Sequence, residues 1–297
     1  MKNVLLVINP NAGKMKSRTA MYEIVSRFCK AGYQVCVQVT QHRGHAAELA
    51  RDSGRNFDLC ICCGGDGTLN EIITGMMCAE RKIPIGYIPA GTTNDFAQSM
   101  HIPLSVKRAT DNIINHEPIK IDIGRLGDRF FTYIASFGAF TAASYNTPQS
   151  TKNTLGHFAY ILEGIRDLSS LHPYKAKIFA NGTEYDGEYI FGAVSNSTSV
   201  GGIVKLNNSV VDMKDGLFEI VLVKCPKNAV EMSKIIHGIT VSDFSSEMFE
   251  FFKSSKIEVE MDEVIPWTLD GEYFEGANST SCEPVSRFTP PSTSISA

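Results

Sequence analysis

Residues 59–71 read Leu59-Cys60-Ile61-Cys62-Cys63-Gly64-Gly65-Asp66-Gly67-Thr68-Leu69-Asn70-Glu71. The apolar run predicts a buried strand, and the segment from Thr68 predicts a helix that begins directly after the glycines. Glycines let the backbone turn tightly and approach a ligand, and the N–H groups at a helix start bind phosphate. Asp66 would repel a phosphate unless a divalent cation lay between them, so these residues indicate a metal–nucleotide complex. Taken alone, they are also consistent with a glycine-rich turn that carries a helix-capping aspartate.

On both sides of this loop, strand-like and helix-like patterns alternate up to about residue 122. Short apolar runs predict strands, and apolar residues at helical spacing predict helices. The predicted strands are Val4–Asn9, Tyr33–Thr40, Phe57–Cys63 and Ile83–Ile88, and the predicted helices are Ser17–Lys30, His45–Arg51 and Thr68–Met77. Strands separated by helices predict a parallel, doubly wound sheet. We therefore expect an α/β domain over residues 1–122.

The sequence after residue 122 has the pattern of β-hairpins. Gly127-Asp128 and Asn181-Gly182 each separate two strand-like segments, as in tight hairpin turns. These segments are Ile119–Leu126 with Phe130–Ser136, and Lys175–Ala180 with Glu184–Ser195; further strands are predicted at Leu217–Val223, Lys256–Met261 and Val264–Leu269, and helices at Leu155–Leu168 and Ala229–Ile239. We expect a mainly antiparallel second domain over residues 123–281, followed by a Ser-, Thr- and Pro-rich, poorly ordered tail over residues 282–297.

Composition limits the classes of protein that this chain can belong to. Its 297 residues, 43% hydrophobic and 20% charged, are typical of a globular protein with two domains. A net charge of −4 argues against general nucleic-acid binding. No apolar run reaches the ~18 residues of a membrane-spanning helix, and the first strand does not resemble a signal peptide, so we expect a cytoplasmic protein. Cys60, Cys62 and Cys63 are expected to be small buried hydrophobic residues and not zinc ligands.

Two more loops of similar character follow predicted strands. The first is Asn9-Pro10-Asn11-Ala12-Gly13-Lys14, and the second is Pro89-Ala90-Gly91-Thr92-Thr93-Asn94-Asp95-Phe96. Parallel sheets bind ligands at the carboxyl ends of their strands, so we expect both loops to converge with the Gly64–Glu71 loop. Any one of the three alone would be weak evidence for a nucleotide site, whereas the combination is strong.

The three motifs together resemble the catalytic domain shared by diacylglycerol kinases and sphingosine kinases, and most closely the soluble bacterial diacylglycerol kinase-like proteins. The resemblance extends from Val4 to about Glu272. In that family the first domain is similar to those of NAD kinases and phosphofructokinases, and the second is a β-sandwich. The family has no P-loop of the G-x-x-x-x-G-K-[ST] kind, and none occurs in this chain.

The resemblance implies an ATP site in the first domain. Residues expected to surround ATP are Asn9, Pro10, Asn11, Ala12, Gly13, Thr40, Gly64, Gly65, Asp66, Gly67, Thr68, Leu69, Asn70 and Thr92. The resemblance also implies that Asp66 and Asp95 organise Mg²⁺ and its waters.

Two further sites are implied in the second domain. Leu269-Asp270-Gly271-Glu272 matches a family motif in which Asp270 is the general base and Glu272 joins the magnesium network. Such a base accepts the proton of a lipid hydroxyl as it attacks the γ-phosphate. A structural Mg²⁺ is implied at the carboxylate of Asp215 and the backbone carbonyls of Asp212 and Leu217. An ordinary Asp-Gly turn and a plain surface turn are the respective alternatives.

The resemblance thus implies an ATP- and Mg²⁺-dependent kinase for the hydroxyl of diacylglycerol or a related lipid, peripheral to the inner membrane surface. An NAD kinase-like enzyme is the first alternative, because it shares the Gly-Gly-Asp-Gly-Thr loop. However, this chain lacks the Thr-Gly-Ser-Thr-Ala-Tyr-type segment of NAD kinases. A nucleotide-binding regulator without catalysis is the second alternative, opposed by the presence of Asp66, Asp95, Asp270 and Glu272. The choice of lipid, and of monomer or homodimer, stays open.

Overall fold

A computed structural model gives the structure of the chain and describes residues 2–138, 171–196, 199–200, 204–205, 213–276 and 279–288. The predicted helix Leu155–Leu168 lies outside these residues. The chain divides into two compact units, and each is considered by itself. The first unit contains the residues up to Ile121 together with the chain from Arg287, and the second extends from Asp122 to Ser286.

The first unit is built on a parallel sheet of four strands, in the order β2-β1-β3-β4. Its strands are β1 (Lys2–Ile8), β2 (Tyr33–Val39), β3 (Leu59–Gly64) and β4 (Ile85–Pro89). Residues Val4–Ile8 of β1 and all residues of β4 are buried, as expected of a parallel sheet whose two faces are covered. Cys60, Cys62 and Cys63 are fully buried in β3, and burial raises the pKa of the Cys60 and Cys63 thiols to about 12.

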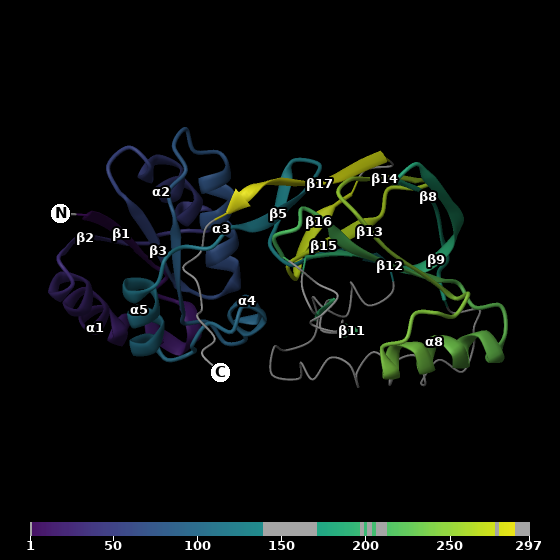
Figure 1. Ribbon diagram of the computed structural model, residues 1–297, viewed down its shortest axis with the longest axis horizontal. Coiled ribbons are helices and arrows are strands. Elements are labelled where there is room, and N and C mark those ends of the chain that lie inside the picture. The colour runs from purple at the N-terminus through teal and green to yellow at the C-terminus, as the bar shows by residue number, and fades with distance from the viewer. Residues whose placement is uncertain are drawn as a thin grey trace. The chain divides into compact units, whose positions relative to one another are not determined.

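Helices cover both faces of this sheet, which confirms the doubly wound α/β prediction (Figure 1). The helices of this unit are η1 (Ala12–Met15), α1 (Lys16–Lys30), α2 (His45–Ser53), α3 (Asp66–Met77), α4 (Asp95–Ser99) and α5 (Val106–Asn115). Helix α1 packs with α5, and α2 packs with α3. Ile24 and Phe28 of α1 join Leu6 and Ile61 of the sheet in one hydrophobic core.

The second unit contains a curled antiparallel sheet of 11 strands, which confirms the prediction of an antiparallel β-sandwich domain. Nine strands follow the order β16-β15-β7-β9-β8-β14-β17-β5-β6, and β12 pairs with both β9 and β13. The strands are β5 (Ile121–Leu126), β6 (Arg129–Phe131), β7 (Ile134–Gly138), β8 (Tyr174–Ala180), β9 (Thr183–Ser195), β12 (Phe218–Lys224), β13 (Phe249–Ser254), β14 (Ile257–Met261), β15 (Pro266–Leu269), β16 (Glu272–Glu275) and β17 (Ser279–Phe288). The short strands β10 (Ser199–Val200) and β11 (Val204–Lys205) form a separate pair.

Two hydrophobic cores lie on the two faces of this sheet. Phe218, Ile220 and Leu222 of β12 belong to the core that also contains Trp267. Val221 and Val223 of the same strand belong to the core under α8 (Ala229–Val241). Because successive side chains of a strand point to opposite faces, burial on both faces explains the continuous apolar run of β12.

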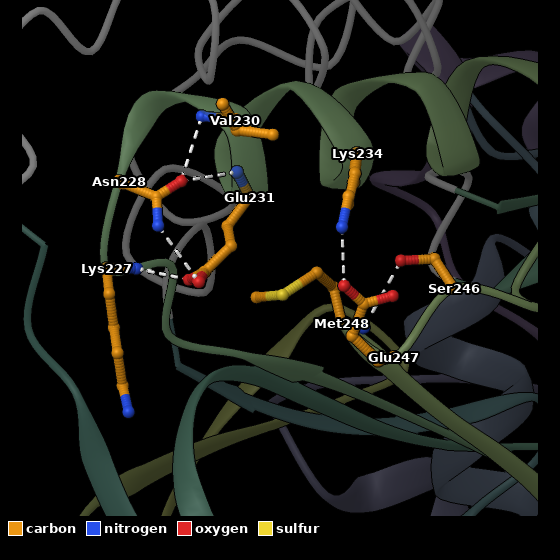
Figure 2. Close-up of polar contacts among 8 residues, drawn as sticks. All are labelled: Lys227, Asn228, Val230, Glu231, Lys234, Ser246, Glu247 and Met248. Carbon is orange, nitrogen blue, oxygen red and sulfur yellow. Dashed lines mark hydrogen bonds and ion pairs between the residues drawn. The ribbon is translucent and has the colours of Figure 1, made fainter.

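Helix α8 begins at a strong cap (Figure 2). The side-chain Oδ1 of Asn228 accepts hydrogen bonds from the N–H groups of Val230 and Glu231, at 3.0 and 2.9 Å. The Glu231 carboxylate accepts in return from the Lys227 N–H at 2.6 Å. The Asn228 side chain thus binds N–H groups of the first helical turn, and the Glu231 side chain binds an N–H group just before the helix, in an arrangement similar to a capping box.

The predicted poorly ordered tail is wrong for residues 282–288, which belong to β17. Its Cys282 is fully buried and lies opposite Ile257 of β14, whereas the neighbouring Ser281 is exposed. The Ser-, Thr- and Pro-rich composition of the segment is typical of disordered chains and led to the wrong prediction. Residues 289–297 lie outside the described residues. Within the part of the chain that the structure describes, no helix is long and apolar enough to cross a membrane.

Candidate active site

Three loops of the first unit meet where β1, β3 and β4 end. The Asn9 N–H donates to the Cys63 carbonyl at 3.0 Å, and the Ala90 N–H donates to the Gly64 carbonyl at 2.7 Å. Each loop therefore stays hydrogen-bonded to its neighbour beyond the last strand residue. The predicted convergence of the three loops is confirmed.

Glycines allow these loops to pack backbone against backbone. Gly13 has a φ of +50°, and a Cβ atom there would lie 1.9 Å from the Ala90 carbonyl oxygen. A Cβ atom on Gly91 would lie 2.6 Å from the Cα of Gly65. Contacts shorter than 3.0 Å force a backbone shift, so side chains at these two positions would push the loops apart.

Asn9 ties the first loop to the start of α3. Its Nδ2 donates to Thr68 Oγ1 at 2.9 Å, and its Oδ1 accepts from the Asn11 N–H at 2.9 Å. One amide side chain thus fixes two of the residues expected to surround ATP. Leu69, by contrast, is 1% exposed, and its N–H donates to the Gly65 carbonyl. It supports the helix, and its side chain belongs to the interior.

Asp66 caps a helix, but a different one from its own. Its Oδ2 accepts from the Asp95 N–H at 3.0 Å and its Oδ1 from the Phe96 N–H at 3.2 Å, both at the start of α4. Thr93 Oγ1 lies 3.4 Å from the same Oδ2. Helix α3 itself is capped by Gly65, without a side-chain hydrogen bond. The structure therefore brings the Asp66 carboxylate to the backbone of Asp95, the other residue predicted to organise magnesium.

Asn94 shapes the third loop and was missed from the sequence. Its Oδ1 accepts from the Gly91 N–H at 2.9 Å, and its Nδ2 donates to the Gly91 carbonyl at 3.0 Å. The residue is buried and has a φ of +54°, a left-handed conformation that asparagine tolerates better than most residues. Asn94 directly precedes the short helix α4, which the sequence pattern did not predict. Thr92, which was predicted to contact ATP, is exposed in this loop.

A hollow of ≈ 580 Å³ lies beside the first loop, within the size range of small-molecule sites. It is found where β1 and β2 end, and the Thr40 N–H donates there to the Ile8 carbonyl at 2.9 Å. Three predicted ATP residues line it, namely Pro10, Asn11 and Thr40. The other lining residues are Ile8, Met21, Val39 and Gln41. This mixture of apolar walls and a few polar groups suits a nucleoside.

In the second unit, the segment of residues 132–134 donates four hydrogen bonds to the carboxylate of Asp270. Its Oδ2 accepts from the N–H of Thr132 at 2.6 Å and from Thr132 Oγ1 at 2.8 Å. Its Oδ1 accepts from the N–H groups of Tyr133 and Ile134, at 3.0 and 3.1 Å. Burial raises the pKa of Asp270, and these hydrogen bonds oppose that effect by stabilising the charged form.

This arrangement explains where one predicted strand was wrong. The segment Phe130–Ser136 was expected to be continuous, but β6 ends at Phe131 and β7 begins at Ile134. The backbone between them turns its N–H groups toward Asp270. Asp270 has a φ of +49° in the turn that joins β15 and β16, and Glu272 is exposed at the first position of β16.

Asp215, the carboxylate of the second predicted magnesium site, forms an ion pair with a lysine side chain. Asp215 Oδ1 accepts from the Leu217 N–H at 2.9 Å, and Asp215 Oδ2 lies 3.4 Å from Lys253 Nζ. Lys253 is the cross-strand neighbour of Glu219, and its Nζ lies 3.0 Å from Glu219 Oε1 without the alignment of a hydrogen bond. Sequence reasoning missed both residues. Asp212 lies outside the described residues.

The oxygen atoms at both positions fit Mg²⁺, which keeps several waters and takes one or two carboxylates. Among the residues that the structure describes, no group of three or more His, Cys, Asp or Glu side chains could hold a metal by itself. Water and phosphate oxygens would therefore complete the coordination at Asp66 and Asp95. At Asp215 a cation would share its carboxylate with the ammonium group of Lys253.

Comparisons with known proteins place the chain in a family. Residues 3–126 match the diacylglycerol kinase catalytic domain, and residues 134–287 match the YegS C-terminal NAD kinase beta sandwich-like domain. The diacylglycerol kinase of Bacillus subtilis (strain 168) is 32% identical over 275 residues, which cover 92% of this chain and 90% of that protein. The diacylglycerol kinase of Staphylococcus aureus (strain MRSA252) is 31% identical over 276 residues, covering 92% and 86%.

Solved structures agree with this assignment. A crystal structure from Bacillus anthracis (strain Sterne) has a TM-score of 0.81 and 25% identity, and the match covers 100% of this chain and 97% of the other. A diacylglycerol kinase structure from the same organism has a TM-score of 0.75 at 22% identity, covering 100% and 98%, and supports the fold alone. Given the relatives above, this chain belongs to the diacylglycerol kinase family.

Proposed function

We propose that this chain is a lipid kinase that transfers the γ-phosphate of ATP to the hydroxyl of diacylglycerol or a related lipid. The observation that carries the proposal is the junction of three glycine-containing loops, with Asp66 hydrogen-bonded to the start of α4 and beside Asp95. The relatives that match nearly the whole chain are named diacylglycerol kinase, which supports a role for this junction in phosphoryl transfer to a lipid. The lipid substrate would bring the protein to the inner membrane surface.

In this proposal the first unit binds ATP. The hollow lined by Pro10, Asn11 and Thr40 takes the nucleoside, and the loop backbones and the start of α3 face the phosphates. Asp66 and Asp95 would hold Mg²⁺ beside the phosphates. When bound, the ion neutralises charge that develops on the phosphate oxygens.

Asp270 is the proposed general base. It accepts the proton of the lipid hydroxyl as that oxygen bonds to the γ-phosphorus, and ADP leaves with the electrons of the broken bond. Support comes from the burial that raises the pKa of Asp270, since a stronger base accepts a proton more readily. Glu272, two residues on, is proposed to join the magnesium network.

A structural Mg²⁺ at Asp215 is the last part of the proposal. The carboxylate of Asp215 and the backbone carbonyls of Asp212 and Leu217 would hold the ion, and it would stabilise the turn before β12. Support comes from the oxygen donors at this turn and from Asp122, whose Oδ2 accepts from the Gly216 N–H at 2.7 Å and so fixes the loop.

An NAD kinase-like activity is the second candidate, since residues 134–287 match a domain described as NAD kinase beta sandwich-like. The deciding experiment supplies the purified protein with γ-labelled ATP, Mg²⁺, and mixed micelles of diacylglycerol, ceramide or a sphingoid base, with NAD as a parallel acceptor. We expect label in an organic-extractable product. Label in NADP without a lipid product would overturn the lipid-kinase proposal, and label in neither would favour a regulator without catalysis.

A further inference from the structure

A side-chain hydroxyl is among the groups that donate hydrogen bonds to Asp270. Of the four hydrogen-bond donors that Thr132, Tyr133 and Ile134 supply to it, three are the backbone N–H groups of these residues. The fourth is the Thr132 hydroxyl, at 2.8 Å from Oδ2. Among these four donors, the Thr132 hydroxyl is the one that a substitution can remove, because the other three belong to the backbone.

The donors to Asp270 lie at an interruption of the β-sheet. Between β6 and β7, residues 132 and 133 are absent from the strand ladder, and their N–H groups bind the carboxylate instead. Asp270 has a φ of +49° and Gly271 a φ of +85°, both in the left-handed region that most residues avoid. Local departures of this kind concentrate at functional sites, where the surrounding structure must hold them in place.

Thr132 is buried more deeply than Asp270. The threonine is 3% exposed, whereas Asp270 keeps part of its surface accessible. The hydroxyl that binds Oδ2 therefore comes from the protein interior. A methyl group at the same place would be too close, since carbon needs roughly 3.5 Å or more from a non-bonded neighbour.

We propose that Thr132 is a positioning residue for phosphoryl transfer, whose hydroxyl fixes the orientation in which Asp270 accepts the proton of the lipid. This inference rests on the proposed function, because it takes Asp270 as the base. Thr132 does not touch the substrate and acts only through Asp270. Misplacing a reacting group by about 1 Å can lower a rate by roughly a hundredfold.

The test compares T132V, T132S and T132A. In T132V a methyl group replaces the hydroxyl and pushes the carboxylate away, so we expect kcat to fall about tenfold to a hundredfold. The KM for ATP and for the lipid should stay within about twofold, because the base contributes to the transition state and not to ground-state binding. T132S keeps the hydroxyl and should retain at least roughly a third of the wild-type kcat. T132A should lie between the two.

T110V is the matched control. Thr110 is fully buried, and its hydroxyl donates to the Val106 carbonyl at 2.8 Å in α5. Its loss should change the melting temperature but leave kcat unchanged. A T132V kcat equal to that of wild type, or a T132S kcat as low as that of T132V, would overturn the positioning role.

A variant with Asp270→Ala separates this inference from the proposed function. If D270A keeps wild-type turnover, Asp270 is not the base and the proposed mechanism fails. If D270A is inactive while T132V is fully active, only the role of Thr132 fails. With both ideas correct, adding T132V to D270A should cause no further loss, because residues that act as a unit are not additive.

Discussion

The Oδ2 atom of Asp66 lies 3.0 Å from the backbone nitrogen of Asp95, 29 residues further along the chain. The carboxylate that follows strand β3 thus caps the helix that follows strand β4. The two roles depend on different atoms. The cap needs an acceptor for the Asp95 and Phe96 N–H groups, whereas the proposed magnesium network needs the negative charge.

Asp66→Asn should therefore lower the stability of the fold slightly and weaken the use of magnesium more strongly. The amide keeps one acceptor oxygen, so loss of part of the cap should cost about 1 kcal/mol of the free energy of unfolding without magnesium. Loss of the charge should raise the Mg²⁺ concentration that gives half-maximal activity by about tenfold. Magnesium titrations of activity, together with thermal melts in EDTA, separate the two effects. An unchanged magnesium requirement would restrict Asp66 to the capping role.

Gly13 and Gly32 form a matched pair for testing how closely the loops pack. Both have positive φ, +50° and +84°, but a Cβ atom on Gly13 would lie 1.9 Å from the Ala90 carbonyl oxygen, whereas one on Gly32 would meet nothing within 4 Å. Gly32→Ala should cost about 1–2 kcal/mol of stability through the strained φ alone, with ATP affinity unchanged. Gly13→Ala should cost more and should weaken ATP binding about tenfold or more, because the first and third loops must separate. Equal effects of the two substitutions on ATP affinity would contradict this.

Much of the first unit could be predicted because its signals are local. Strands β3 and β4 are short apolar runs that end at a glycine and a proline, and the parallel topology places the carboxyl ends of all four strands at one edge. The errors arise where residues distant in sequence decide the local structure. Helix α4 has five residues, too few for a helical period, and is capped by Asp66 from another loop. The interruption at Thr132 depends on Asp270, 138 residues away.

The Lys253–Glu219 pair shows the same limitation in the predicted structural magnesium site. Burial raises the pKa of Glu219, and nearby Lys253 opposes the effect. Nothing in the sequence near residue 219 indicates this partner, because it comes from the facing strand β13. The Lys253 ammonium group therefore lies close to two carboxylates, that of the buried Glu219 and that of Asp215, which was predicted to bind the ion.

Substitution of Lys253 should reveal which cation Asp215 prefers. Lys253→Met leaves Glu219 buried without a counter-ion and should cost about 3 kcal/mol in the absence of Mg²⁺. If a magnesium site exists at Asp215, the variant should bind the ion more tightly than wild type and recover part of its melting temperature. Asp215→Ala should abolish any magnesium-dependent stabilisation. Melting temperatures that do not respond to Mg²⁺ in wild type, K253M or D215A would remove the site.

Asp270→Asn gives the sharpest test of the proposed base. An amide cannot accept the lipid proton as a carboxylate does, so turnover should fall by roughly 10²–10⁴-fold. The substitution is also less neutral than its size suggests. Each oxygen of Asp270 faces two donors, so the new NH₂ group must face hydrogen-bond donors whichever way the amide turns. We therefore expect a stability loss of about 1–3 kcal/mol as well.

Nucleotide titration and thermal melting distinguish lost chemistry from lost structure. The proposed ATP residues belong to the first unit and Asp270 to the second, so the affinity for ATP should stay nearly unchanged in D270N. Measured below its melting temperature, the variant should still have its low turnover, because the missing base and not unfolding limits the rate. Turnover above about a tenth of wild type would mean that another group accepts the proton. Loss of ATP binding in a folded D270N protein would instead show that nucleotide binding depends on the second unit, contrary to the proposed separation of roles.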